Sequence, residues 1–360
     1  MGIANQDKKR VTLAQIAAEA GVSASTVAYV IHNKPNPWSI RESTREHVLA
    51  TAAKLGYRPN AAARSLATGR SQAILMVGVN FGSYSWDTGI GEQLRGIESY
   101  LVPKEYATHV YTLDASSNMD AYRDIIMSGR VDGVIVAGTA TPQLYSVLQK
   151  LYAIADKAGL PIVSLSDTMP NENKGVSINI DEKSGAEQAT SHLIWHGHQR
   201  IALLGVIDAP WAISRECGYK SALIEAGLKT DENSIVLLEH HTQQLAYEAT
   251  LQLAKSVEFT AMFAMSDALA LAAILALRSV GRRVPGDCAV IGFDDQHTLT
   301  EYADPPLTSI HNPFYESGKT AAETIVKIIE GQPINPGILP VSLVIRESCG
   351  CSFPRSPLKK

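Results

Sequence analysis

The chain has 360 residues, of which 45% are hydrophobic and 19% are charged. This length is too great for one hydrophobic core and predicts two or three domains. The composition is that of an ordinary soluble globular protein. No apolar run approaches the eighteen or so residues that a membrane span needs. The first ten residues have no apolar segment behind their charges, which argues against a secretory signal. We therefore expect a cytoplasmic protein without a membrane partner.

The net charge of −4 conceals an uneven distribution of charged residues. Residues 1–70 contain ten lysines and arginines against four acidic residues, whereas the remaining 290 residues contain 22 basic and 32 acidic ones. A basic head on an acidic body is the distribution expected for a protein that binds a phosphate backbone with one end only. A solvated basic surface is the alternative, but it does not account for the segregation.

Four cysteines are scattered along the chain, at Cys217, Cys288, Cys349 and Cys351. Their number and spacing fit reduced thiols in a cytoplasmic protein. The pair in Cys349-Gly350-Cys351 is closely spaced and has no second ligand pair beside it in the sequence, so we expect no metal there.

Residues 11–32 predict two short helices joined by a tight turn. Thr12 and Gln15 form a capping-box pair at the start of the first helix, and Gly21 ends that helix in a left-handed conformation. Ser23 can cap the second helix. Apolar residues at helical spacing give each helix a buried side: Leu13, Ile16 and Ala17 in the first, Val27, Val30 and Ile31 in the second. This is the pattern of a helix-turn-helix, whose second helix can lie in a DNA major groove; a helical hairpin in an ordinary core is the alternative.

A third helix is predicted over residues 42–55, with Val48, Leu49 and Ala52 facing inward and Gly56 closing it. Pro59 then blocks continuation and Asn60 can cap a short helix over residues 61–67. A helix of so few residues is not stable alone in water. We therefore interpret this segment as a hinge that becomes ordered only against a partner.

From residue 72 onward, continuous apolar strands alternate with amphipathic helices. This pattern predicts parallel sheets covered on both faces, and its two successive sets predict two Rossmann-like lobes. Ligands of such folds bind at the carboxyl ends of the strands. The expected strands of the first set are 74–79, 110–113, 131–136 and 161–165; a second set begins at Val176 and continues with 201–204, 235–238, 261–264 and 289–292. Representative helices are expected near 91–101, 185–196, 214–226 and 268–281.

The chain resembles the lactose-repressor (LacI/GalR) family of bacterial transcription regulators. The resemblance rests on VTLAQIAAEAGVSASTV, on LGYRPNAAARSLATG and on later segments that include GRVDGVIVAG, RECGYKSALIEAGL, VPGDCAVIGFDD and LVIRES. It covers nearly the whole chain in family order, and it implies a small all-α helix-turn-helix domain and a hinge helix. An α/β effector domain with two lobes then follows, built like a periplasmic binding protein.

The expected boundaries follow from the resemblance and the pattern. Residues 1–58 form the DNA-binding domain, 59–71 the hinge and linker, 72–350 the effector-binding and dimerisation domain, and 351–360 a tail. The first lobe takes about 72–170 plus 311–332, and the second lobe about 171–310 plus 333–350. The tail has no heptad pattern, so a coiled-coil tetramerisation segment is not expected.

The resemblance also places the DNA contacts. Residues that would meet bases, phosphates or the minor groove are Thr12, Ser23, Ala24, Ser25, Thr26, Tyr29, His32, Thr44, Tyr57, Asn60, Arg64, Leu66 and Ala67. Leu66 would be the apolar wedge that kinks the duplex from the minor groove; packing between the lobes is its alternative. Tyr29 stands where the family usually has arginine, and tyrosine cannot grip guanine bidentately. We expect a family-like central step with altered flanking bases.

The resemblance implies effector contacts by Arg215 and Asp294, and it places Ser266 where the family more often has asparagine. Asp167, at the end of a predicted strand, is a candidate second acceptor, and Trp86 and Trp211 are expected in loops that face the cleft between the lobes. Arg215 opposite Asp294 suits a polyhydroxylated ligand, such as a sugar or sugar phosphate. A ligand that lacked a hydroxyl group would leave one of these buried side chains without a hydrogen-bond partner. A salt bridge between the lobes without a ligand is the alternative. Asp267 is interpreted as a helix cap, and the two tryptophans either stack on a sugar ring or pack.

We therefore predict a homodimeric, effector-controlled regulator that binds a pseudo-palindromic operator and represses carbohydrate-utilisation genes. A sugar-binding protein without a regulatory role is the main alternative. An enzyme is not expected, because His196 and His198 lack a plausible nucleophile or metal set nearby. Asp294 and Asp295 should point to different sides, and phosphate-binding glycine loops are missing. Apart from the effector, no cofactor is expected.

Overall fold

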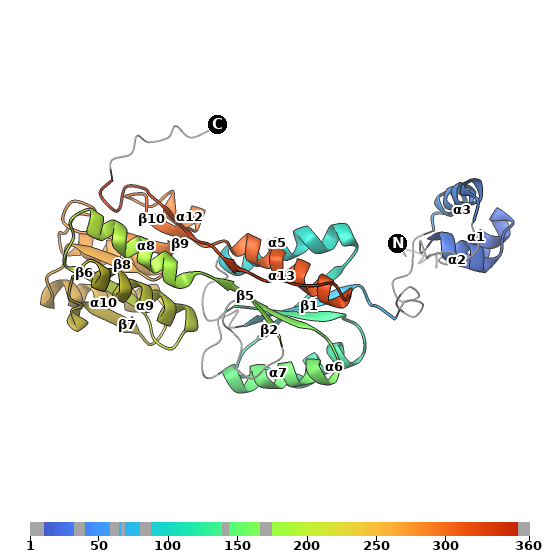
Figure 1. Ribbon diagram of the computed structural model, residues 1–360, viewed down its shortest axis with the longest axis horizontal. Helices are drawn as coiled ribbons and strands as arrows, with labels where there is room; N and C mark the ends of the chain where they lie inside the picture. The colour runs from blue at the N-terminus through green and yellow to red at the C-terminus, as the bar shows by residue number, and fades with distance from the viewer. Residues whose placement is uncertain are drawn as a thin grey trace, which may run out of the picture. The chain divides into compact units, whose positions relative to one another are not determined.

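The computed structural model describes residues 11–31, 40–57, 65, 69–79, 88–138, 144–165 and 175–351. The chain divides into two compact units, Met1–Ser71 and Gln72–Lys360 (Figure 1). In the described part of the chain, no helix is long and apolar enough to cross a membrane.

The first unit contains the expected helix-turn-helix. Helix α1 spans Leu13–Ala20 and α2 spans Ala24–Ile31. The capping box of Thr12 and Gln15 is present, and Gly21 leaves α1 with a φ of 65°. The Ser23 hydroxyl accepts a hydrogen bond from the Thr26 amide at 3.1 Å, which caps α2. The local predictions for both helix starts and for the turn are confirmed.

Helix α3 (Glu42–Lys54) completes a small apolar core with α1 and α2. Val48 and Ala52 are buried as predicted, but Leu49 is wrong, because 46% of it is exposed. Thr51 is buried instead. Positions 48, 51 and 52 share one helical face, and the residue after Val48 is rotated by about 100° away from that face.

The first lobe of the second unit is built on a six-stranded sheet in the order β11-β5-β4-β3-β1-β2, with every pairing parallel. Its strands are β1 (Ala73–Val79), β2 (Ala107–Leu113), β3 (Gly133–Gly138), β4 (Ile162–Leu165), β5 (Val176–Ile180) and β11 (Ile338–Leu339). The central strands β1 and β3 are apolar and buried, as expected where helices cover both faces of a sheet, whereas β2 and β5 also carry polar residues.

Helices cover both faces of this sheet. Alternate residues of β1 and β3 point to opposite faces, so Ile74 and Ile135 pack in one core and Leu75 and Val134 in the other. Helices α5 (Thr88–Leu101) and α13 (Phe314–Ile329) belong to the first of these cores, α6 (Met119–Met127) and α7 (Tyr145–Lys157) to the second. A short 3₁₀ turn (Val102–Lys104) follows α5.

The second lobe repeats the arrangement, with the order β12-β10-β9-β8-β6-β7. All of its pairings are parallel except that of β12 with β10. The strands are β6 (Ile201–Val206), β7 (Ile235–Leu238), β8 (Ala261–Ala264), β9 (Ala289–Asp294), β10 (Thr308–His311) and β12 (Ser342–Val344). The helices are α8 (Glu182–Trp195), α9 (Pro210–Glu225), α10 (Gln243–Ser256), α11 (Asp267–Ser279) and α12 (His297–Thr300), with a 3₁₀ turn over Glu232–Ser234.

The lobes exchange strands at positions that the sequence pattern did not predict. Val176 was expected to open the second set, but β5 pairs with β4 in the first sheet, so the second lobe begins with α8. Strand β11, expected in the second lobe, pairs with β5. The described chain therefore passes between the lobes after β5, after β10 and after β11. Short strands placed by long-range pairing carry no local signal of the sheet they join.

Close helix contacts in each lobe depend on glycine. A β-carbon at Gly96 in α5 would overlap the Tyr315 carbonyl oxygen of α13, and one at Gly218 in α9 would overlap the Lys183 carbonyl oxygen of α8. Each obstacle is backbone, which cannot rotate away. By contrast, a β-carbon at Gly91, also in α5, would meet nothing within 4 Å.

Candidate DNA-binding surface and effector site

The exposed side of α2 forms the candidate DNA-reading surface. Ala24 and Ser25 are exposed, whereas Thr26 and Tyr29 are half-buried. Val27 and Val30 anchor the opposite side of the helix in the core of the first unit. The described residues that were predicted to meet bases are uncharged, and all but Tyr29 have small side chains, which lets the helix backbone come close to the bases.

The predicted phosphate-contacting residues lie around this core. Thr12 is exposed at the start of α1, Thr44 is half-buried in the first turn of α3, and Tyr57 follows α3. Burial raises the pKa of the Tyr57 phenol, so it stays a neutral hydrogen-bonding group. The predicted contacts His32, Asn60, Arg64, Leu66 and Ala67 lie outside the described residues.

A buried ionic cluster lies at the carboxyl edge of the second lobe's sheet. The Arg215 guanidinium, on α9, donates to the Glu182 carboxylate at 2.7 Å and to the Asp294 carboxylate at 3.1 Å. It also donates to the Met265 carbonyl oxygen. Only 4% of the Arg215 side chain is exposed, so this pair of carboxylates shares one guanidinium away from solvent. Because two carboxylates share one guanidinium, the cluster carries a net negative charge, which favours a further hydrogen-bond donor.

The expected Arg215–Asp294 partnership is present, but it is a direct contact within the second lobe. It is therefore not the salt bridge between lobes that was considered as the alternative. Arg215 also lies between two aromatic rings, with its guanidinium carbon 4.6 Å from the Trp211 ring centroid and 3.5 Å from that of Phe293. Stacking and ion pairing together fix the guanidinium plane.

Asp294 and Asn312 end adjacent parallel strands and lie side by side. The Asn312 amide donates to Asp294 Oδ1 at 3.3 Å, and both hydrogen bonds that Asp294 receives from described residues end on that same oxygen. Asn312 is 3% exposed, and its own Oδ1 has no partner among the described residues. Burial raises the pKa of Asp294, an effect that Arg215 and Asn312 oppose. A buried acceptor without a partner is costly, so this edge is prepared for donors from a ligand.

Ser266 and Trp211 are the other described members of the predicted effector set. Ser266 caps α11, and its hydroxyl lies 2.7 Å from His241 Nε2. Trp211 was expected in a loop but belongs to the first turn of α9, where its ring meets the His241 ring edge-on at 6.2 Å between centroids. Asp167 and Trp86 lie outside the described residues.

Two further carboxylates have structural partners. Asp267 was interpreted as a helix cap, but Ser266 takes that position; Asp267 instead accepts from the Gln296 amide at 2.7 Å. Burial and the nearby acidic groups raise its pKa well above the usual value. Asp295 turns away from Asp294, as predicted, and pairs with Arg346 at 2.7 Å. Burial alone would raise the pKa of Asp295, but His311 and Arg346 outweigh it and lower that pKa.

Sequence reasoning missed three members of this edge: Glu182, His241 and Asn312. Each follows directly or closely on a strand of one of the two sheets, β5, β7 and β10 respectively. The rule that ligands bind where parallel strands end could have singled out Asn312 and His241. Glu182 could not be found that way, because it enters the second lobe from a strand of the first.

These features define a class of protein: a helix-turn-helix DNA-binding unit joined to a periplasmic-binding-like domain of two lobes. Residues 12–60 match the bacterial regulatory proteins of the lacI family, and residues 190–349 match the periplasmic binding protein-like domain. The chain is 33% identical to the HTH-type transcriptional regulator CelR of Thermobifida fusca over 347 residues, which cover 95% of this chain and 99% of that protein. It is 31% identical to catabolite control protein A of Priestia megaterium, covering 94% and 99% of the two chains.

Solved structures agree with these matches. The lac repressor dimer bound to operator and the anti-inducer ONPF aligns with a TM-score of 0.77 at 26% identity, covering 95% of this chain and 99% of that one. A CelR–cellobiose complex aligns with a TM-score of 0.69 at 30% identity, covering 94% and 100%. The chain belongs to the LacI family of bacterial transcriptional regulators.

Proposed function

We propose that this regulator represses carbohydrate-utilisation genes and that a sugar-like effector, bound at the carboxyl edge of the second lobe's sheet, controls its affinity for an operator. The observation that carries the proposal is the buried edge of Arg215, Asp294 and Asn312, where Asn312 Oδ1 has no hydrogen-bond donor among the described residues. The cellobiose complex of CelR is consistent with a polyhydroxylated ligand. The protein would act in the cytoplasm, where the operator is.

Each polar residue at this edge takes a distinct role. Asp294 Oδ2 and Asn312 Oδ1 accept hydrogen bonds from hydroxyl groups of the effector, and Arg215 mainly holds the Asp294 carboxylate in place. A guanidinium has five N–H donors; among the described residues, Nη1 of Arg215 donates to the Met265 carbonyl oxygen alone, so its second N–H can serve a ligand oxygen. Trp211 supplies a ring face for the apolar side of a sugar. Trp86 and Asp167 would complete the site from the first lobe. Ser266 would act on the effector indirectly, through its hydrogen bond with His241.

On the DNA side, we propose that two chains related by a twofold axis place their α2 helices on a pseudo-palindromic operator. Ser23, Ala24, Ser25, Thr26, Tyr29 and His32 would face the bases. Thr12, Thr44, Tyr57 and Asn60 would face phosphates, and Arg64, Leu66 and Ala67 the minor groove. An effector needs a coupling free energy of only about 1–3 kcal/mol to shift operator occupancy appreciably.

Calorimetry with a panel of mono- and disaccharides tests the effector site. A sugar should bind the wild-type chain, while Asn312→Leu and Asp294→Asn should each weaken binding by about tenfold or more, the effect of unpairing a buried polar group. Asp287→Asn is the matched control, because Asp287 pairs with Arg283 on an exposed surface of the same lobe. Equal affinities for the wild type and both edge variants would contradict the proposed site.

Selection of bound DNA from a random pool, at near-physiological salt, tests the DNA-binding role. We expect a palindrome with a flexible central step and outer bases that differ from the family's common ones. Tyr29→Arg should shift the outer bases toward guanine, since arginine reads guanine bidentately. Failure to bind any DNA at low salt, by a protein that still binds sugar, would support a sugar-binding protein without a regulatory role.

A further inference from the structure

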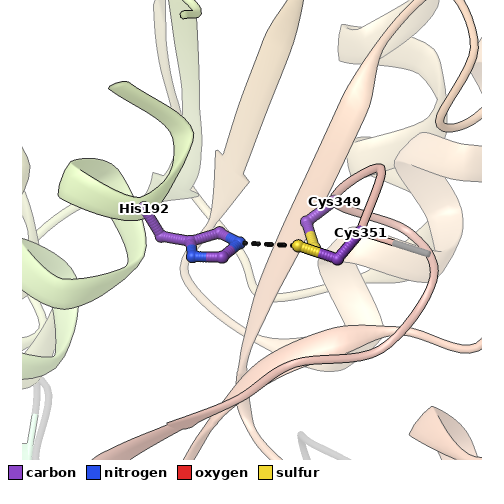
Figure 2. A group of neighbouring side chains, drawn as sticks. All are labelled: His192, Cys349 and Cys351. Carbon is purple, nitrogen blue, oxygen red and sulfur yellow. Dashed lines mark hydrogen bonds between the residues drawn. The ribbon is translucent and has the colours of Figure 1, made fainter. Parts of the chain in front are cut away.

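Two histidines and two cysteines lie together at the C-terminal end of α8. We call the proposed effector site of Arg215, Asp294 and Asn312 the effector edge, and this end of α8 is remote from it. The Cys351 sulfur lies 3.6 Å from His192 Nε2 and 3.0 Å from His196 Nε2. The potential ligand atoms of His192, Cys349 and Cys351 all lie within 4.8 Å of one another (Figure 2). We expected the cysteine pair to stand alone and His196 to lack a metal-ligand set nearby, and both expectations were wrong. His192 and His196 lie beside Cys351, although they precede it by about 155 residues in the chain.

The fold itself brings these side chains together. His192 and His196 are four residues apart at the end of a helix and share one face. The segment that carries the cysteines is held by Ser348, whose hydroxyl donates to the Val290 carbonyl of β9 at 2.6 Å and accepts from the Thr308 amide of β10 at 2.8 Å. Gly350, with a φ of 90°, forms the turn between the two cysteines. A left-handed residue at this point is most easily glycine.

We propose that His192, Cys349 and Cys351 bind a zinc ion, with His196 as the fourth ligand. Zinc takes sulfur at about 2.3 Å and imidazole nitrogen at about 2.0–2.1 Å in a tetrahedron, which places neighbouring ligand atoms roughly 3.5–4 Å apart. The Cys351–His192 separation of 3.6 Å already has this value, and the ligand atoms of His192, Cys349 and Cys351 lie within 4.8 Å of one another. His196 Nε2 lies 3.0 Å from the Cys351 sulfur and would complete the tetrahedron after its side chain moves. Two thiolates and two imidazoles suit zinc, whereas magnesium and calcium prefer oxygen ligands.

Burial makes the ligand set a defined site. Cys349 is 1% exposed, and His192, His196 and Cys351 are each half-buried. Trp195 lies against His196, with its ring edge-on at 4.8 Å between centroids, and is 78% exposed. Because three of the four proposed ligands are only half-buried, an ion can reach them from solvent.

A zinc ion here would tie the last described turn of the chain to α8. The same helix begins at Glu182, which holds Arg215 in the effector cluster. Ten residues separate Glu182 from His192, about 15 Å at the rise of an α-helix. The site is thus structural and distinct from the effector edge, so variants at the two places can be compared without overlap.

Zinc content tests the site. The full chain, kept reduced with a phosphine, is incubated with zinc sulfate, desalted and measured by mass spectrometry of the metal. We expect one zinc ion per wild-type chain and its loss in Cys351→Ser and in His192→Gln. The matched controls are Cys217→Ser, an exposed cysteine elsewhere in the second lobe, and His109→Gln, an exposed histidine of the first lobe. Both controls should retain the ion.

Two further measurements separate coordination from folding. Cobalt in place of zinc should give the visible absorption of tetrahedral cobalt–thiolate coordination in the wild type and in both controls, and not in Cys351→Ser. Because an ion that binds only the folded state stabilises it, zinc should raise the Tm of the wild type and leave that of Cys351→Ser unchanged. His196→Gln should weaken retention without abolishing it.

The proposal is overturned if the reduced wild-type chain retains far less than one ion. It is equally overturned if Cys351→Ser and His192→Gln, with wild-type circular dichroism, bind zinc as the wild type does.

Discussion

The two lobes have equivalent strand orders but bury different chemistry. Reading each sheet from one edge, β11-β5-β4-β3-β1-β2 corresponds to β12-β10-β9-β8-β6-β7. In the described part of the first lobe, the fully buried polar side chains are uncharged: Gln93, Ser164, Ser317 and Thr324. The second lobe buries Arg215, Asp267 and Asp295 as well. The first lobe forms this topology without buried charged side chains, so the fold does not require those of the second lobe. The buried charges of the second lobe need another explanation.

For Arg215, the explanation that we propose is recognition of the effector, whereas Asp267 and Asp295 have structural partners in Gln296 and Arg346. Buried ion pairs rarely stabilise a fold more than well-packed apolar residues would, because desolvation offsets the attraction between the charges. The second lobe carries this cost at the strand ends where the proposed effector binds. The following experiments measure how far the two lobes really differ.

The largest effect is expected for Arg215→Met. Removal of the guanidinium leaves Glu182 and Asp294 as buried carboxylates without their shared cation, which should cost about 3–5 kcal/mol of unfolding free energy. Urea unfolding followed by circular dichroism measures the change. Adding Glu182→Gln and Asp294→Asn to this variant should recover part of the loss.

The matched change in the first lobe is Ser164→Ala, which removes the 2.9 Å hydrogen bond between Ser164 and Ser177. A neutral hydrogen bond contributes about 0.5–1.5 kcal/mol. If Arg215→Met and Ser164→Ala lowered the free energy of unfolding by similar amounts, the proposed contrast between the charged interior of the second lobe and the uncharged interior of the first would not hold.

Helix packing should be equally sensitive in both lobes. Gly96→Ala and Gly218→Ala each push a methyl group into the backbone of a neighbouring helix, and overpacking of this kind costs about 1–3 kcal/mol or more. Gly91→Ala is the control in α5, and it should stabilise by about 0.4–1 kcal/mol because the site is open. Thermal unfolding of the three variants gives the comparison. A neutral Gly218→Ala beside a damaging Gly96→Ala would show that α8 and α9 can separate.

A smaller effect is expected in the first unit from Ser23→Ala. Loss of the cap on α2 should cost about 1 kcal/mol, and it should lower the midpoint of the first unit without changing that of the effector domain. Ser25→Ala, on the exposed side of α2, is the control and should leave stability within about 0.5 kcal/mol of the wild type. Equal losses in the two variants would argue that Ser23 contributes no specific cap.

The smallest effect concerns pH. The Asp295 carboxylate, 3.4 Å from His311 Nδ1, raises the pKa of that imidazole. The raised pKa in the folded state means that the contribution is fully present below the unfolded histidine pKa of about 6.5 and is lost as pH rises through the folded value. His311 is 42% exposed, so the contribution should stay below about 1 kcal/mol. His311→Gln should flatten this part of the Tm–pH profile; an unchanged slope would assign it to another group.

Local signals predicted the fold well, and distant contacts limited the prediction of the site. The cap at Thr12, the turn at Gly21 and the apolar strands depend on neighbours in sequence, and these predictions were confirmed. Arg215 and Asp294 were found through resemblance to a family. Glu182, Asn312 and the histidine partners of Cys351 are brought into place by pairing of segments far apart in the chain. Spacing cannot reveal such partners, because no local rule links them.

The exchange of strands between the lobes has a consequence for biosynthesis. The sheet of the first lobe lacks β11 until residue 339 is made, and that of the second lacks β12 until residue 344. At about 5–20 residues per second, the ribosome needs on the order of ten seconds or more to travel from the end of β5 to these strands. Neither lobe can be completed while most of the chain is being translated, so a nascent chain can finish the helix-turn-helix long before it has a finished effector domain to control it.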